Sequence, residues 1–217
     1  MARLNLLFIP FFIFCSCGKE KKETLPVITE RFIKNNERSC ERITATKYET
    51  VDELLQDFIA SAKYKDSLEL NVRLGTYYHY REEYDSAFFF YGKAESIDAT
   101  DADLHFNMAL AYSEKSEFER ALKSIENSLV LCDERWEYLN SKCYILGNLN
   151  RCEEAVKIGL ISKAINPENK KMYGNLLRCF DKLNQRDSVL RYITLIDSKF
   201  NQTADWINEL KKKYNQQ

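Results

Sequence analysis

Two stretches of the sequence repeat one pattern of residue types at an interval of 34 positions. LGTYYHYREEYDSAFFFY, residues 74 to 91, aligns with MALAYSEKSEFERALKSI, residues 108 to 125. Small residues fall on small residues and aromatic residues on aromatic ones, and the agreement continues to residue 131. A fixed period of this length predicts a fold built from one repeated unit, in which each unit buries its apolar face against the next.

Within the unit, the apolar residues follow the spacing of two helices. Leu74 and Tyr78 lie four positions apart, and Ala87, Tyr91 and Ala94 continue the same kind of stripe further on. The intervening YREEYD supplies a short polar turn, which predicts two antiparallel helices. Only six Gly and three Pro occur in the chain, so long helices are allowed almost everywhere.

This order of residue types resembles the tetratricopeptide repeat (TPR), in which Leu-Gly, Tyr, Ala and an aromatic residue recur every 34 positions. The resemblance implies an all-α, TPR-like α-solenoid of antiparallel helix pairs with a C-terminal capping helix. It places repeats at 68–101, 102–135, 136–169 and 170–203, the last two divergent, and the capping helix at 204–217. The residues expected to pack these repeats are Leu74, Gly75, Tyr78, Ala87, Tyr91, Met108, Ala109, Tyr112, Ala121 and Ala155.

The third and fourth copies depart from the pattern. Lys142 occupies a position where an apolar residue is expected, and Gly159 one where a large residue is expected. In the fourth copy Val189 replaces the small residue at the helix crossing, which predicts more open packing.

Cap-like spacings mark the expected starts of helices. Asp66 with Glu69, and Thr100 with Asp103, predict the N-termini of two first helices. Thr203 is expected to cap the last helix. Upstream, Thr50 begins a capping-box pattern before an apolar stripe, so residues 28–67 are interpreted as leading helices that form a possible degenerate repeat.

The N-terminus has the features of an export signal. An apolar run from Leu4 to Phe14 follows Arg3, so residues 1–16 are interpreted as a signal peptide. FCSC at 14–17 resembles the processing site of bacterial lipoproteins, which implies lipidation at Cys17, a tether over 17–27 and a lipid anchor in the bacterial cell envelope, facing the periplasm or the cell surface. The alternative is a simple cleaved signal peptide with an incidental cysteine.

Signals of chemistry are scarce. The histidines His79 and His105 have no ligand spacing, and no phosphate loop or nucleophile elbow is present, so no catalytic residue, metal or cofactor is predicted. The formal net charge of -1 gives no basic excess for nucleic acid. Five cysteines follow Cys17, but their spacings do not fix a pairing.

Function is therefore sought on the concave surface that the TPR resemblance implies. The resemblance predicts a groove for a protein or peptide partner, with a noncatalytic scaffold as the function. The residues predicted to line this groove are Arg73, Thr76, Phe106, Asn107, Leu110, Tyr144, Asn175 and Arg178. The amides would hold an extended peptide through its backbone, and the aromatic residues would offer apolar contact. The alternative is a lipoprotein that binds a glycan or another small ligand on Tyr80, Phe106 and Tyr144.

Overall fold

A computed structural model describes residues 67–200 and 204–215 of the chain. The predicted signal peptide, Cys17, the tether, residues 28–66 and Thr203 lie outside the described residues. The described residues form helices joined by short turns and contain no strand, so the prediction of an all-α fold is confirmed. No helix in these two ranges combines the length and the apolar character needed to cross a bilayer.

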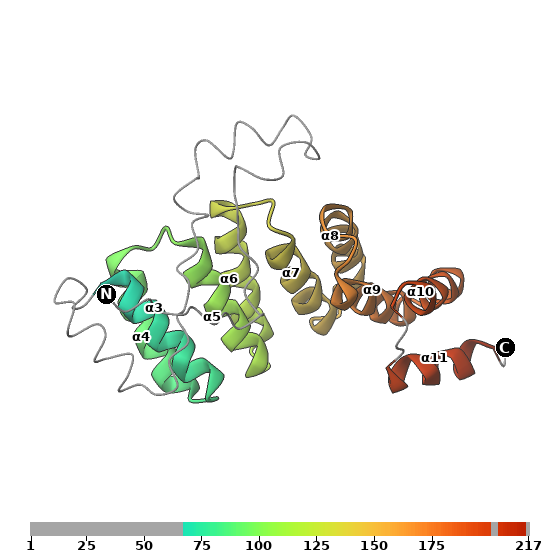
Figure 1. Cartoon of the computed structure of the whole chain (residues 1–217), viewed down its shortest axis with the longest axis horizontal. Helices are drawn as coiled ribbons and strands as arrows, with labels where there is room; N and C mark the ends of the chain where they lie inside the picture. The colour runs from blue at the N-terminus through green and yellow to red at the C-terminus, as the bar shows by residue number, and fades with distance from the viewer. Residues whose placement is uncertain (1–66, 201–203, 216–217) are drawn as a thin grey trace, which may run out of the picture. The chain divides into compact units, whose positions relative to one another are not determined.

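The helices form a regular series (Figure 1). The first helix of each pair has 13 residues and the second has 14, and equivalent helices begin 34 positions apart. Each pair lies within one of the predicted 34-residue segments. The helices are α3 (Leu68–Tyr80), α4 (Tyr84–Ile97), α5 (Ala102–Glu114), α6 (Phe118–Leu131), α7 (Trp136–Asn148), α8 (Cys152–Ile165), α9 (Lys170–Lys182), α10 (Arg186–Lys199) and α11 (Asp205–Asn215).

The chain divides into two compact units, which are described separately. Of the described residues, the first unit contains 67–116 and 127–133, and therefore α3, α4, α5 and the end of α6. The second unit contains 117–126 and the chain from residue 134 onward, and therefore the start of α6 and α7 to α11.

Every turn between paired helices contains one residue in the left-handed conformation. Glu82, Ser116, Asn150 and Asn184 have φ angles between 53° and 62°, and they also lie 34 positions apart. In the first of these turns the N–H of Glu83 bonds to a carbonyl five residues earlier, as in a Schellman motif, and two later turns repeat this bond. The repeated turn conformation explains why the helix boundaries keep one register.

The N-terminal caps of α3 and α5 lie one residue beyond the predicted positions. Ser67 accepts a hydrogen bond from the N–H of Leu70 at 3.1 Å, so it is the cap of α3 in place of Asp66. Asp101 accepts from the N–H of Leu104 at 2.7 Å and caps α5. The predicted cap, Thr100, is engaged elsewhere, because its hydroxyl donates to Oδ1 of Asp98. Both caps are therefore polar residues of the predicted kind, but each lies one residue later in the sequence than predicted.

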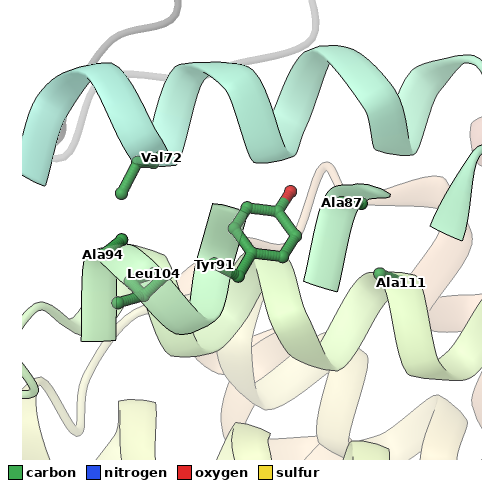
Figure 2. Close-up of a cluster of buried hydrophobic side chains, with 6 residues drawn as sticks. All are labelled: Val72, Ala87, Tyr91, Ala94, Leu104 and Ala111. Carbon is green, nitrogen blue, oxygen red and sulfur yellow. The ribbon is translucent and has the colours of Figure 1, made fainter. Parts of the chain in front are cut away.

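The core of the first unit is built around a ring of α4 that fits against a glycine of α3. Figure 2 shows Tyr91 between the helices, surrounded by small and aliphatic side chains of α3, α4 and α5. A Cβ on Gly75 would lie 2.4 Å from Cδ1 of Tyr91, so only glycine leaves room for the ring. The hydroxyl of Tyr91 donates to Oγ1 of Thr76 at 3.4 Å. Of the predicted packing residues, Leu74, Gly75, Ala87, Tyr91, Ala109, Ala121 and Ala155 are buried, while Tyr78, Met108 and Tyr112 are half-buried.

The second unit reverses this pairing at the same two repeat positions. Cys143 takes the place of Gly75, and Gly159 takes the place of Tyr91. A Cβ on Gly159 would lie 2.9 Å from Sγ of Cys143 and 2.7 Å from Cδ2 of Leu176. The small residue in α8 therefore admits a side chain from α9, which is the physical reason that Gly159 stands where a large residue was expected.

The predicted open packing at Val189 is wrong. Val189 is fully buried within the second unit. Leu176 of α9 is also fully buried, and Ile196 of α10 exposes only 1% of its surface. The larger crossing side chain is thus accommodated without exposing the core.

Candidate peptide-binding cavity

The predicted groove residues of the first unit are mostly buried. Arg73, Thr76, Phe106 and Asn107 expose between 5% and 9% of their surface. Thr76 is a core residue, because its hydroxyl donates to the carbonyl of Val72 at 2.9 Å. Leu110 is half-buried. Because a partner needs accessible side chains, the candidate site does not include this set.

The second unit contains a cavity of about 630 Å³ between α7, α9 and α11. It brings together three of the predicted groove residues, Tyr144, Asn175 and Arg178. A cavity of this size suits a ligand of a few residues or a small molecule. Further residues that line it are Cys143, Gly147, Asn148, Cys179, Asp181, Lys182, Trp206, Glu209, Leu210 and Lys213.

Polar side chains of α9 line one wall of the cavity, next to an aromatic ring of α11. Asn175 donates from Nδ2 to Oδ1 of Asn140 at 3.1 Å, which fixes the two amides relative to each other across α7 and α9. The guanidinium of Arg178 lies 4.6 Å from the ring centre of Trp206, within cation–π range. A Cβ on Gly174 would lie 3.6 Å from Cζ2 of Trp206, so the indole packs beside α9 at this glycine. The wall therefore offers a flat aromatic surface next to hydrogen-bonding groups.

A carboxylate of α9 holds α11 against the cavity. Asp181 accepts from Nζ of Lys213 at 2.6 Å and from the hydroxyl of Tyr214 at 2.7 Å. Burial opposes ionisation of Asp181, but these two hydrogen bonds outweigh it and hold the pKa of the carboxyl below its ordinary value. Arg186 adds a bond from its guanidinium to the carbonyl of Tyr214 at 2.9 Å. These bonds link the end of α9 and the start of α10 to the last helix, α11.

Among the charged side chains that line the cavity, the guanidinium of Arg178 is available to bind a ligand. Lys213 is paired with Asp181, and Lys182 donates to the carbonyl of Gly147 at 2.6 Å and to Oδ1 of Asn150 at 3.0 Å. Within the described ranges, no carboxylate lies at salt-bridge distance from Arg178. The Arg178 side chain is exposed, so its donors are free to meet an incoming acceptor.

The sequence did not reveal that α11 forms one wall of this site. Trp206 and Leu210, one helical turn apart in the predicted capping helix, both line the cavity. The missed residue with the strongest role is Lys182, whose contacts depend on the left-handed turn at Asn150. No residue spacing in the sequence signals such a contact, which joins two hairpins.

In the part of the chain that the structure describes, no group of three or more His, Cys, Asp or Glu side chains is placed to hold a metal ion. Cys143, Cys152 and Cys179 are free and buried.

Comparisons with known proteins agree with this architecture. Neither protein-family models nor curated proteins match the sequence. Solved structures do match: YrrB, a TPR protein described as having an unusual peptide-binding site, is 16% identical with a TM-score of 0.64, over 75% of this chain and 85% of YrrB. PilF of Pseudomonas aeruginosa is 15% identical with a TM-score of 0.61, over 80% and 77% of the two chains.

A third match is MamA, which is 14% identical with a TM-score of 0.61 and spans 88% of this chain and 99% of MamA. At these identities the similarity concerns the fold. The chain has the TPR-like, all-α solenoid fold, so the prediction drawn from the 34-residue period is confirmed.

Proposed function

We propose that this chain is a membrane-anchored, noncatalytic scaffold of the bacterial cell envelope, and that it binds an extended peptide segment of a protein partner. The observation that carries the proposal is the cavity between α7, α9 and α11, where Tyr144, Asn175 and Arg178 meet. YrrB, which shares the fold, is described as having a peptide-binding site, and this supports a ligand of the same class here.

The cavity residues suit the chemistry of an extended peptide. The amide of Asn175, which its bond to Asn140 holds in place, offers hydrogen-bonding groups to a peptide backbone without regard to the peptide sequence. Tyr144, with 37% of its surface exposed, and Trp206 provide apolar surface for one side chain. Arg178 is placed to bind an acidic side chain, because a guanidinium forms paired hydrogen bonds with a carboxylate. The expected ligand is therefore a peptide with an acidic residue close to an apolar one.

The proposed location rests on the N-terminal sequence and on one cysteine. The signal-like residues 1–16 and the cysteine at position 17 support export and lipid attachment.

Peptide binding is tested by selection from a displayed library of random peptides against the full chain. The affinities of the selected peptides are then measured by calorimetry for the wild type, Arg178→Glu and Arg191→Glu. Arg191 is an exposed arginine of α10 that does not line the cavity, so it controls for the change in net charge.

We expect Arg178→Glu to weaken binding at least tenfold, about 1.4 kcal/mol, and Arg191→Glu to leave it within about twofold. Equal losses in the two variants, or a library that yields no binder, would contradict the proposal.

Attachment is tested separately with Cys17→Ser in cells. The wild type is expected to sediment with membranes and to incorporate a labelled fatty acid. The Cys17→Ser variant should lose the label and leave the membrane fraction. If the variant partitions into membranes as the wild type does, lipidation at Cys17 is refuted.

A glycan or another small molecule is the second candidate ligand. The volume of about 630 Å³ and the presence of Tyr144 and Trp206 in one cavity favour it. Of the other rings predicted to stack on a ligand, Phe106 is buried and Tyr80 lies in the first unit. A thermal-shift screen against envelope glycans would identify this function by a stabilisation that Tyr144→Ala abolishes.

A further inference from the structure

Two walls of the cavity, α7 and α9, run in the same direction and are held in register. Asn175 of α9 donates to Asn140 of α7 at 3.1 Å. Seven residues later in both helices, Nζ of Lys182 donates to the carbonyl of Gly147 at 2.6 Å. Because the contacts advance by the same number of residues in each helix, α7 and α9 lie parallel to each other along the cavity.

The third wall, α11, follows the same direction. A Cβ on Gly174 would lie 3.6 Å from Cζ2 of Trp206, so the indole packs beside the start of α9. Seven residues later in both helices, Nζ of Lys213 donates to Asp181 at 2.6 Å. The cavity therefore has an aromatic end at Trp206 and a charged end at Lys182.

Two cations of α9 line the cavity between these ends. Arg178 and Lys182 are both exposed, and their spacing of four residues places them on the same side of the helix. Lys182 bonds to neutral oxygen atoms, the carbonyl of Gly147 and Oδ1 of Asn150, and a third ammonium proton remains for a ligand. Within residues 67–200 and 204–215, neither cation has a carboxylate at salt-bridge distance.

The acidic side chains of the cavity do not neutralise this pair of cations. Asp181 accepts hydrogen bonds from Lys213 and from the hydroxyl of Tyr214. Among the described residues that line the cavity, the other carboxylate belongs to Glu209 of α11. Two unpaired cations thus face one further carboxylate, and the α9 wall attracts an acidic ligand.

The distance between the two cations selects a spacing in the ligand. Positions four residues apart in an α-helix are separated by about 6 Å along the axis. In an extended peptide, alternate side chains point to the same face and lie about 6.6–6.8 Å apart, whereas adjacent side chains point to opposite faces. An extended peptide can therefore present carboxylates to Arg178 and Lys182 together when its two acidic residues alternate. Gly174, where Trp206 packs, lies one further step of four residues along α9.

We propose that the ligand of this cavity is an extended peptide with two acidic residues at alternate positions and an apolar residue at the next alternate position. Arg178 binds the first carboxylate through paired hydrogen bonds, Lys182 binds the second as a point charge, and Trp206 contacts the apolar side chain. This inference rests on the proposed peptide-binding function and narrows it to one spacing. Both chain directions satisfy the order of the three subsites.

The spacing is tested by fluorescence anisotropy with the full chain and labelled peptides that are capped at both ends. The alternating peptide is Gly-Ser-Leu-Ser-Glu-Ser-Glu-Ser-Gly, made also with its sequence reversed. The control, Gly-Ser-Leu-Ser-Ser-Glu-Glu-Ser-Gly, has the same composition and charge but adjacent acidic residues, and it is likewise made in both directions. The alternating peptide, in the direction that binds better, should bind at least about fivefold more tightly than either control.

The role of Lys182 is tested by pairing Lys182→Gln with a peptide in which the glutamate farther from leucine is replaced by glutamine. Lys182→Gln should weaken binding of the two-acid peptide at least about fivefold and that of the one-acid peptide by less than about twofold. A merely structural role of Lys182 would weaken both equally. Lys157→Gln is the matched control, because Lys157 is an exposed lysine of α8 that does not line the cavity, and it should leave both affinities within about twofold.

The outcomes separate this inference from the function on which it rests. Equal affinities for the alternating and adjacent peptides, or equal losses for the two-acid and one-acid peptides in Lys182→Gln, would overturn the inference and leave peptide binding in place. The same holds if peptides selected from the random library bind in the cavity and the alternating peptide does not. A chain that binds neither the library peptides nor this set would overturn the proposed function and this inference together.

Discussion

The contact between Gly75 and Tyr91 leads to a quantitative prediction for Gly75→Ala. The added Cβ would lie 2.4 Å and 2.5 Å from Cδ1 and Cε1 of the ring, well inside the ordinary contact distance. The ring has no free space, because Tyr91 is fully buried and its hydroxyl is bonded to Thr76. Overpacking of this kind costs about 1–3 kcal/mol, and a contact this short belongs in the upper part of that range.

Gly92→Ala provides the matched control. Gly92 lies in α4 of the same hairpin, is exposed, and a Cβ there would meet nothing within 4 Å. Both substitutions gain the same helix propensity, about 1 kcal/mol. Gly92→Ala should therefore stabilise the chain by about 1 kcal/mol, while Gly75→Ala destabilises it by about 1–2 kcal/mol. The difference of about 2–3 kcal/mol isolates the overpacking.

Urea unfolding followed by circular dichroism measures both variants. The slopes should match that of the wild type, so that the midpoints report the free energy of unfolding. In a Tyr91→Leu background the penalty of Gly75→Ala should shrink, because the ring that it meets has gone. The reasoning is refuted if Gly75→Ala and Gly92→Ala stabilise the chain equally.

Three further predictions concern a cap, a turn and the last helix. Burial raises the pKa of Asp101 to about 6, so the folded chain holds a proton there that the unfolded chain releases above about pH 4. Stability from this group therefore falls as pH rises from about 4 to 6. Asp101→Asn, which keeps the cap, should remove this fall from the profile of urea midpoint against pH. A profile identical to that of the wild type would contradict the role of Asp101. Glu82→Asn should raise stability by about 0.5–1 kcal/mol in thermal unfolding, because Asn tolerates the φ of 62° better than Glu; a loss of stability would count against strain there. Asp181→Ala removes two bonds to α11 and should favour local opening of that helix by about 1–2 kcal/mol in hydrogen exchange, whereas unchanged protection would exclude this role.

The sequence was sufficient to predict the architecture because the repeat is encoded locally. Each hairpin needs an apolar stripe on each of its two helices and a turn of fixed length. These features recur every 34 positions even where the residue types change. The left-handed turn residue keeps this register in the divergent copies, including Asn150 and Asn184.

Departures from the expected residue types could not be interpreted one position at a time. Gly159 and Cys143 satisfy the packing as a pair, and Leu176 from the following hairpin completes it. The composition of one helix shows only half of such an arrangement. The same limit applied to the caps, where neighbouring polar residues at 100 and 101 compete and the local geometry decides.

The candidate site was only partly predictable. The repeat pattern identified Tyr144, Asn175 and Arg178, which line one cavity, but burial removed Thr76 and Asn107 from the accessible set. That burial depends on packing between elements, which the spacing of residues within one helix does not record.

Hydrogen exchange of the full chain with and without a selected peptide shows where the peptide binds. Binding in the proposed cavity should protect α7, α9 and α11, including the amides around Tyr144, Arg178 and Trp206, and leave the exposed face of α10 around Arg191 unchanged. Protection confined to α3 and α5, or to α10, would show that the peptide binds elsewhere and would contradict the account.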